Sequence, residues 1–191
     1  MKAYIYPMFK GADPGHGWHM TDPIFGKVPT IGACMPNIRR LVEPGDYIFV
    51  ISGRVPRVRP YVVGGFKVSE KIDALAAYKR FPTNRLKELP DGSLSGNIII
   101  NPDGTQNPLD YHKNFEKRVT DYIVGQDPIC LDQPGEIEMA REQTLEVLGR
   151  ILNRKEKQLS DVVGRWRKLN PDQIQEILLW LRGLKKPLLA R

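Results

Sequence analysis

The stretch from Asn37 to Arg59, NIRRLVEPGDYIFVISGRVPRVR, restricts the fold more than any other part of this 191-residue chain. Its centre, residues 47–51 (YIFVI), is a run of aromatic and aliphatic residues typical of a strand covered on both faces. Pro44 disfavours helical backbone at the residue before it, and Gly45 can adopt a left-handed conformation. The sequence therefore predicts a short helix, a Pro-Gly-Asp corner and then a core strand.

The short helix before the corner has one apolar face and one basic face. Ile38, Leu41 and Val42 lie at helical spacing, which places them on the same side. Arg39 and Arg40 are then predicted to point away from most of that apolar face.

The loop after the strand carries three arginines. Ser52 and Gly53 are small, and Arg54, Arg57 and Arg59 follow within six residues, interrupted by Pro56 and Pro60, which stiffen the loop. A guanidinium can make planar, bidentate contacts to phosphate oxygens or base edges, so the loop is typical of a polyanion contact. A solvated, positively charged loop is the alternative.

The composition is that of a globular chain with a basic excess. Its 41% hydrophobic content suffices for one domain plus an appendage, and 29 Lys and Arg against 22 Asp and Glu give a net charge of +7. This excess modestly favours a polyanionic partner. No apolar run approaches the roughly 18 to 20 residues of a membrane span, so we expect a cytoplasmic protein with no membrane partner. Cys34 and Cys130 are too few for a disulfide framework.

Residues 11–30 hold four glycines and three prolines without periodicity, which predicts a long loop of the kind that often carries function. Trp18 on this loop can stack on a nucleobase or plug the end of a sheet. His16 and His19 together with Cys34 offer three metal ligands, but they lack the spacing of a structural zinc site. We therefore predict no metal site and no cofactor.

The rest of the chain reads as short strands followed by helices, an α+β pattern. The final helix has a strong start, with Asn170 as N-cap, Pro171 at the first position and Gln173 at the third. We expect a β-rich domain over residues 1–135 and a C-terminal helical extension over 136–191. The expected elements are strands at 2–6, 61–68 (broken at Gly64-Gly65), 97–100 and 118–124, and helices at 69–80 (capped by Ser69), at 136–152, after Ser160 (a short helix containing Trp166) and after Asn170.

Several segments together resemble a known family. The pattern N-x-R-R-x4-G-D at 37–46 with the following strand and VVGGFKV is similar to the PUA-like superfamily, especially its EVE-like and ASCH-like members. The stretches 30–46, NPLDYHKNFEKR, DYIVGQDPI and GRWRKLNPDQ resemble more closely the nucleotide modification associated domains. The resemblance implies a small mixed β-barrel with peripheral helices and a pocket for a flipped-out, often modified base, in proteins associated with DNA modification or defence.

The resemblance also implies site residues. The chain lacks the aromatic-His-Ser ending that EVE-like members have on this strand, and only Ser52 remains of it. The implied base-binding residues are Asn37, Arg39, Ser52 and Gly53 at the pocket mouth, covered by Trp18 and His19, and the phosphate-binding residues are Arg40, Arg54, Arg57 and Arg59.

Three functions follow as hypotheses. The first is a noncatalytic module that binds a nucleic acid, DNA rather than RNA, or a nucleotide, and accommodates a modified base. The second is an enzyme acting on a nucleotide or modified base, and the third is a protein-interaction component of a defence system that docks a partner through Leu178 and Leu181. The acid-base groups available to the enzyme are His16, His19, Asp13 and His112.

Overall fold

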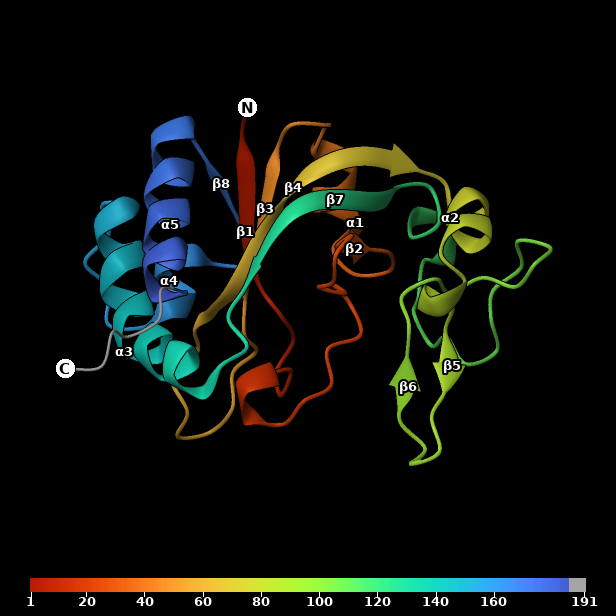
Figure 1. Cartoon of the computed structure of the whole chain (residues 1–191), viewed down its shortest axis with the longest axis horizontal. Helices are drawn as coiled ribbons and strands as arrows, with labels where there is room; N and C mark the ends of the chain where they lie inside the picture. Colours follow the sequence, from red (N-terminus) through yellow and green to blue (C-terminus); the bar gives the residue numbers. More distant parts are fainter. Residues whose placement is uncertain (186–191) are drawn as a thin grey trace. The chain divides into compact units, whose positions relative to one another are not determined.

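The computed structural model describes residues 1–185 and shows a mixed α+β chain, as predicted (Figure 1). The chain forms two compact units. Unit 1 holds residues 1–19, 46–66 and 129 onward, and unit 2 holds residues 20–45 and 67–128. The predicted domain boundary after Gly135 stays a prediction, and residues 186–191 of the predicted extension lie outside the described residues.

Within residues 1–185, no helix combines the length and apolarity that crossing a membrane requires.

In unit 1 the strand order is β4-β3-β1-β8. β1 (Ala3–Pro7) pairs in parallel with β3 (Tyr47–Ile51) and antiparallel with β8 (Arg167–Leu169). The first half of β4 (Val62–Ile72) belongs to the same unit. Residues 48–51 are completely buried, so the predicted core strand is confirmed. The prediction that the C-terminal part is wholly helical is wrong, because β8 pairs along the free edge of β1.

In the described part of unit 1, up to residue 185, three helices complete the unit together with the 3-10 turn η1 (Pro14–His16). They are α3 (Pro134–Ile151), α4 (Leu159–Val163) and α5 (Pro171–Leu184). α4 packs on β1, and α3 packs on α4 and α5 (Figure 1).

The start of α5 is confirmed. The Asn170 side chain accepts a hydrogen bond from the Gln173 N–H at 2.9 Å, and the Gln173 side chain accepts one from the Asn170 N–H at 3.0 Å. The apolar stripe of this helix faces inward, because Leu178 and Leu181 are buried. The hypothesis that these two leucines dock a partner protein is therefore wrong. They belong to the core of unit 1.

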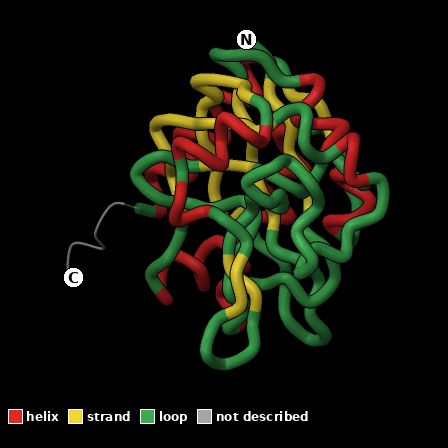
Figure 2. Tube along the Cα trace, turned by 90° about the vertical axis from the view of Figure 1, so that its right-hand side faces the viewer, coloured by secondary structure: helices red, strands yellow, loops and turns green. Residues whose placement is uncertain are grey.

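Unit 2 is built on the strand order β2-β7-β4, with the second half of β4. β2 (Thr30–Ile31) pairs antiparallel with β7 (Tyr122–Cys130). A short hairpin of β5 (Lys87–Glu88) and β6 (Leu94–Ser95) is closed by a turn in which the Gly92 N–H donates to the Leu89 carbonyl at 2.9 Å (Figure 2). The remaining elements are α1 (Pro36–Leu41), α2 (Ala74–Arg80) and the 3-10 turns η2 (Pro82–Asn84) and η3 (Phe115–Lys117), around a core of Ala74, Ala77, Ile98, Ile100, Tyr122 and Val124.

Three predicted elements of unit 2 need correction. The strand expected at 118–124 begins only at Tyr122 and continues to Cys130. The helix expected from Ser69 begins at Ala74, with Asp73 as N-cap, because residues 69–72 continue β4 and the Ser69 hydroxyl donates to the Val124 carbonyl across the sheet at 3.0 Å. The strand expected at 97–100 makes only isolated bridges among the described residues.

The double glycine in β4 does not interrupt the strand. A Cβ at Gly64 would lie 2.0 Å from the Ile129 carbonyl oxygen, and one at Gly65 would lie 2.3 Å from the Phe49 ring. Close approach of the Ile129 backbone at Gly64 and of the Phe49 ring at Gly65 therefore explains both glycines. In neither unit does the ladder of described strands close on itself, so the expected barrel is not confirmed.

Candidate functional site

Two loops of unit 1, residues 8–19 and 52–61, are joined by backbone hydrogen bonds. The Gly53 N–H donates to the Ala12 carbonyl at 2.6 Å, and the Gly11 N–H donates to the Arg54 carbonyl at 3.0 Å. A Cβ at Gly53 would lie 1.9 Å from the Phe9 carbonyl oxygen. Glycine is therefore required at 53 for the two loops to approach this closely. We call this pair of segments the loop pair.

Arg141 of α3 clamps the loop pair from one side. Its guanidinium donates to both carboxylate oxygens of Asp13 at 2.8 and 2.9 Å, and to the Arg59 carbonyl at 2.5 Å. It also lies over the Tyr61 ring, 4.6 Å from the centroid. Asp13 is only 1% exposed. Its carboxylate is thus consumed by a structural ion pair, which does not favour the acid-base role that the enzyme hypothesis gave it.

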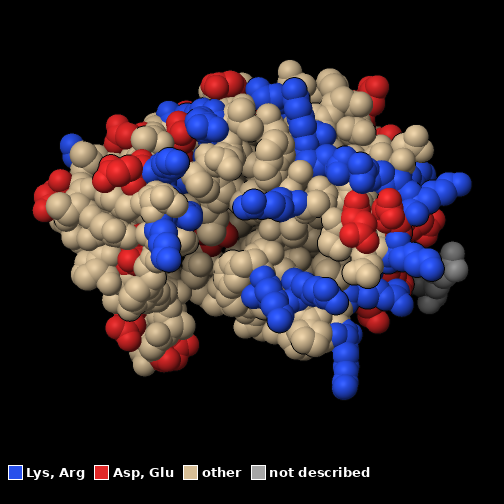
Figure 3. All heavy atoms as spheres, turned by 180° about the vertical axis from the view of Figure 1, so that it is seen from behind, with Lys and Arg blue, Asp and Glu red and all other residues tan. Residues whose placement is uncertain are grey.

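The arginine loop has a fixed backbone and free side chains. The Ser52 N–H donates to the Tyr61 carbonyl at 2.8 Å, and the Ser52 hydroxyl accepts from the Tyr61 N–H at 3.0 Å, which closes the base of the loop. Arg54, Arg57 and Arg59 are exposed, and within residues 1–185 none of their guanidinium groups forms an ion pair. Extended Lys and Arg side chains also project from the face shown in Figure 3.

Aromatic side chains accompany these cations in the loop pair. The half-buried Trp18 packs edge-on against Phe9, with ring centroids 5.4 Å apart and an interplanar angle of 90°. Phe9 is 61% exposed. His16 and His19 are exposed. In the part of the chain that the structure describes, no cluster of His, Cys, Asp or Glu could hold a metal ion.

Unit 2 contains a buried carboxylate that organises the segment before α1. The Asp22 carboxylate accepts hydrogen bonds from the N–H groups of Gly32 (3.0 Å), Ala33 (2.9 Å) and Cys34 (2.5 Å), and from the Asn97 amide at 3.1 Å. Asp22 is 6% exposed. The carboxylate therefore has its hydrogen-bonding capacity filled by its own chain.

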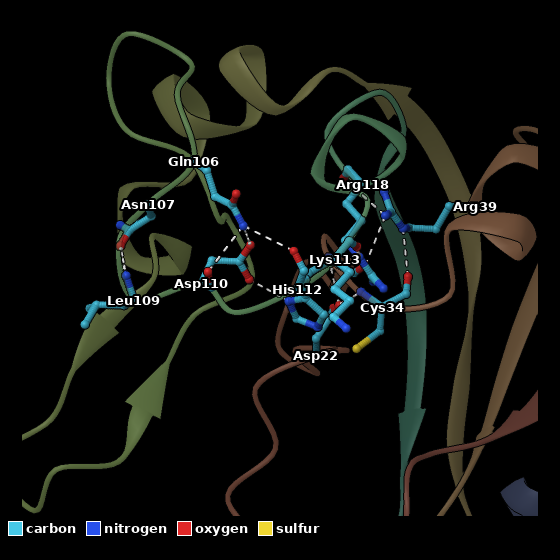
Figure 4. Close-up of polar contacts among 11 residues, drawn as sticks. Asp22, Cys34, Arg39, Gln106, Asn107, Leu109, Asp110, His112, Lys113 and Arg118 are labelled. Carbon is cyan, nitrogen blue, oxygen red and sulfur yellow. Dashed lines mark hydrogen bonds and ion pairs between the residues drawn. The ribbon is translucent and has the colours of Figure 1, made fainter.

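Arg39 is the cationic counterpart of Asp22, and the prediction that it points away from the apolar face is wrong. Ile38 and Val42 are buried as expected, but Arg39 is 0% exposed and Leu41 is 38% exposed. The Arg39 guanidinium compensates for its burial by donating to backbone carbonyls (Figure 4). These acceptors are Cys34 (2.8 Å), Ala33 (3.2 Å), Arg118 (3.1 Å) and Asp121.

Burial shifts the pKa of two groups in this cluster, Arg39 and Cys34. Burial lowers the pKa of Arg39, while Asp22 and Asp121 oppose that shift. Burial raises the pKa of the Cys34 thiol, and the Asp22 carboxylate raises it further. Cys34 is thus held as a thiol, which is the unreactive form, so it does not supply a nucleophile for the enzyme hypothesis.

An aspartate–histidine pair lies in the same unit, and it is a feature that sequence reasoning missed. His112 Nδ1 lies 2.5 Å from the Asp110 carboxylate. Asp110 is 9% exposed, whereas the His112 side chain is 40% exposed. The D-x-H spacing within NPLDYHKN is the sequence pattern that could have predicted this pair, since residues two apart in an extended loop can share a face.

The structure distributes the predicted site residues over both units. The loop pair of unit 1 brings together Ser52, Gly53 and the three loop arginines, with Trp18 and His19 on its other segment. Asn37, Arg39 and Arg40 lie on α1 in unit 2, where Asn37 and Arg40 are exposed.

Comparison with known proteins adds one likeness. No family model matches the chain, and no curated protein matches it. Among solved structures, the chain is similar to the N-terminal domain of Thermococcus gammatolerans McrB bound to m5C DNA. The two share 8% sequence identity with a TM-score of 0.42, over 97% of this chain and 100% of that one. A TM-score of this size does not establish a common fold.

Proposed function

We propose that this chain is a nucleic-acid-binding module and that the loop pair of unit 1 is its contact surface. Arg54, Arg57 and Arg59 bind backbone phosphates, and the neighbouring Trp18 and Phe9 offer ring faces and edges to a base. The observation that carries the proposal is the combination of three exposed guanidinium groups without ion pairs and a backbone that is already fixed.

Preorganisation is the physical reason for this assignment. Ordering a flexible loop on binding costs about 1 to 2 kcal/mol for each residue whose backbone becomes fixed. Here hydrogen bonds at Gly53, Arg54, Arg59 and Tyr61 hold the backbone before any ligand arrives. Binding then has to order only the arginine side chains, whose planar groups suit phosphate oxygens.

The proposal assigns different tasks to the other predicted residues. Ser52 and Gly53 shape the loop rather than touch the ligand, because both are buried and hydrogen-bonded within the chain. Arg39 supports unit 2, since its donors already serve four carbonyls. Asn37 and Arg40, exposed on α1, are assigned a separate contact of unit 2 with the same kind of ligand. DNA with an accommodated, modified base is the proposed partner.

Salt-dependent binding tests the proposal. A fluorescein-labelled DNA duplex and its single strand are titrated by fluorescence anisotropy at several salt concentrations, with the wild-type chain and with an Arg54→Gln, Arg57→Gln, Arg59→Gln variant. Loss of three phosphate contacts should lower the slope of log affinity against log salt by about 2 for the single strand and nearly 3 for the duplex. Affinity at about 50 mM salt should fall by roughly tenfold or more.

A variant with the same change in net charge provides the matched control. Lys155, Lys157 and Arg182 are exposed, and replacing all three by Gln should leave the salt slope within about 1 of the wild-type value if the loop pair is the contact. Equal losses in both triple variants would reduce the effect to net charge and overturn the assignment of the loop pair. Repeating the titration with methylated and unmethylated strands tests the accommodated base.

A further inference from the structure

The segment Gln106–Lys113 of unit 2 holds one aromatic side chain outward. Tyr111 is 84% exposed, the largest value among the exposed large hydrophobic residues of 1–185. An exposed tyrosine alone would require no explanation. The surrounding contacts show, however, that the backbone on both sides of Tyr111 is fixed.

Gln106 clamps the turn around Tyr111. Its side-chain amide lies within hydrogen-bond distance of the Asp110 carbonyl (3.2 Å), the Asp110 carboxylate (2.7 Å) and the His112 carbonyl (3.2 Å) (Figure 4). The residues immediately before and after Tyr111 are thus bound to the same side chain. The Asp110 N–H also donates to the Asn107 carbonyl at 2.9 Å.

The C-terminal side of the turn is anchored to the rest of unit 2. The Arg118 side chain donates to the Lys113 carbonyl at 3.0 Å and to the Ala33 carbonyl at 2.7 Å. Phe115 packs against the core of the unit. With Phe115 held inward and residues 110, 112 and 113 held through their carbonyls, Tyr111 is presented to solvent on a fixed backbone.

The groups beside Tyr111 are cationic or neutral toward solvent. The single acid of the turn, Asp110, is directed inward to His112 and Gln106 and is 9% exposed. His112 is partly exposed, and with Nδ1 on Asp110 its Nε2 is left for an outside partner, since within residues 1–185 no second group bonds the ring. Lys113 is exposed without an ion pair inside the described part of the chain.

We propose that Tyr111, His112 and Lys113 form a second contact site, one that binds an unpaired nucleotide of a single-stranded nucleic acid. The base stacks on the Tyr111 ring, while Lys113 and the protonated His112, which donates from Nε2–H, bind the adjoining phosphate. An aromatic face flanked by cations is the combination that single-strand binding uses, because every base has a face that can stack. The inference rests on the proposed function only in taking a nucleic acid as the ligand.

The pairing of Asp110 with His112 also raises the question of a catalytic role for His112. A histidine oriented by a carboxylate is the geometry of a general base. No thiolate or hydroxyl nucleophile contacts the His112 ring within residues 1–185, and Cys34 is held as a thiol. We therefore assign the His112 ring to binding. The experiment below includes a search for a reaction product, which would indicate catalysis.

The test compares Tyr111→Ala, Tyr111→Phe and wild type for binding to a mixed-sequence single strand of about 12 nucleotides and to the corresponding duplex. Loss of one stacked base should weaken single-strand binding roughly 5- to 150-fold. Tyr111→Phe should stay within about twofold of wild type, because the stacking ring remains. Duplex binding should be unchanged, since paired bases are not free to stack, and the salt slope of Tyr111→Ala should equal that of wild type.

The control is Leu179→Ala, which removes another exposed apolar side chain, 66% exposed on α5, and should change neither affinity. Single-strand affinity of Tyr111→Ala equal to wild type would overturn this inference and leave the loop pair untouched. Normal affinity of the three-arginine variant, with a defect in Tyr111→Ala, would overturn the loop pair and support this site. A product of altered mass that disappears in His112→Ala would replace binding by catalysis, and no binding of either probe by wild type would overturn both proposals.

Discussion

Arginine side chains in the two units differ in burial, although the local sequence predicts that all of them are exposed. In unit 2 Arg39 is fully buried and donates to four backbone carbonyls. In unit 1 Arg54, Arg57 and Arg59 extend from a loop whose backbone, rather than side chains, carries the hydrogen bonds. The guanidinium of Arg39 is occupied by backbone carbonyls, whereas the backbone of the arginine loop is hydrogen-bonded by other groups. The three loop guanidinium groups are therefore available to a ligand.

The largest effect should come from the buried arginine. Arg39→Met keeps much of the aliphatic volume but leaves four carbonyls without their donor, so unfolding free energy should fall by about 3 to 5 kcal/mol. Urea denaturation followed by circular dichroism measures this change. The neighbouring Arg40→Met, at an exposed position, should stay within about 0.5 kcal/mol of wild type. Equal stabilities of the two variants would remove the contrast on which the comparison depends.

A smaller effect is expected where the loop pair closes. Gly53→Ala would place a Cβ 1.9 Å from the Phe9 carbonyl oxygen, so the two loops must separate, at a cost of about 1 to 3 kcal/mol in stability. Nucleic-acid affinity should fall with it, because the arginines lose their fixed backbone.

Gly26→Ala provides the control for the glycine prediction. No atom lies within 4 Å of a Cβ at Gly26, so both stability and affinity should be nearly unchanged. Loss of affinity without loss of stability in Gly53→Ala would show that loop geometry matters for binding alone, which would sharpen the proposal. Normal affinity would argue against preorganisation.

The smallest effect concerns the two thiols, one in each unit. Burial raises the pKa of Cys130 from 9.0 to about 11, and burial together with Asp22 raises that of Cys34 further. Iodoacetamide at pH of about 8 should therefore modify Cys34 more slowly than Cys130, by tenfold for each unit of difference between their pKa values. Peptide mass mapping after timed quenching measures both rates in one sample.

The sign of the pH dependence follows from the same shifts. A thiol whose pKa is raised in the folded state contributes stability that is present below its unfolded pKa and is lost as pH rises through the folded value. For Cys130 this window runs from 9.0 to about 11. Unfolding free energy should decline across it, and less so in Cys130→Ala. Faster modification of Cys34 than of Cys130 would contradict the burial of Cys34 beside Asp22 and Arg39.

The sequence by itself determined those parts of the protein that depend on local patterns. The apolar run of residues 47–51 predicted a buried strand, because successive residues of a strand point to opposite faces, and five apolar residues in a row bury both faces. The Asn170–Gln173 spacing predicted the start of α5, because a capping box is made by residues three apart. Exposure of the loop arginines followed from prolines and small residues around them.

The tertiary structure alone decided what depends on distant partners. Arg39 is buried because carbonyls of residues 33, 34, 118 and 121 converge on it, and nothing in the local spacing reveals that convergence. β8 exists because β1, near the other end of the sequence, offers it a free edge. A hydrogen bond between residues far apart in the chain leaves no periodic trace in the sequence, so it can be found only once the chain is folded.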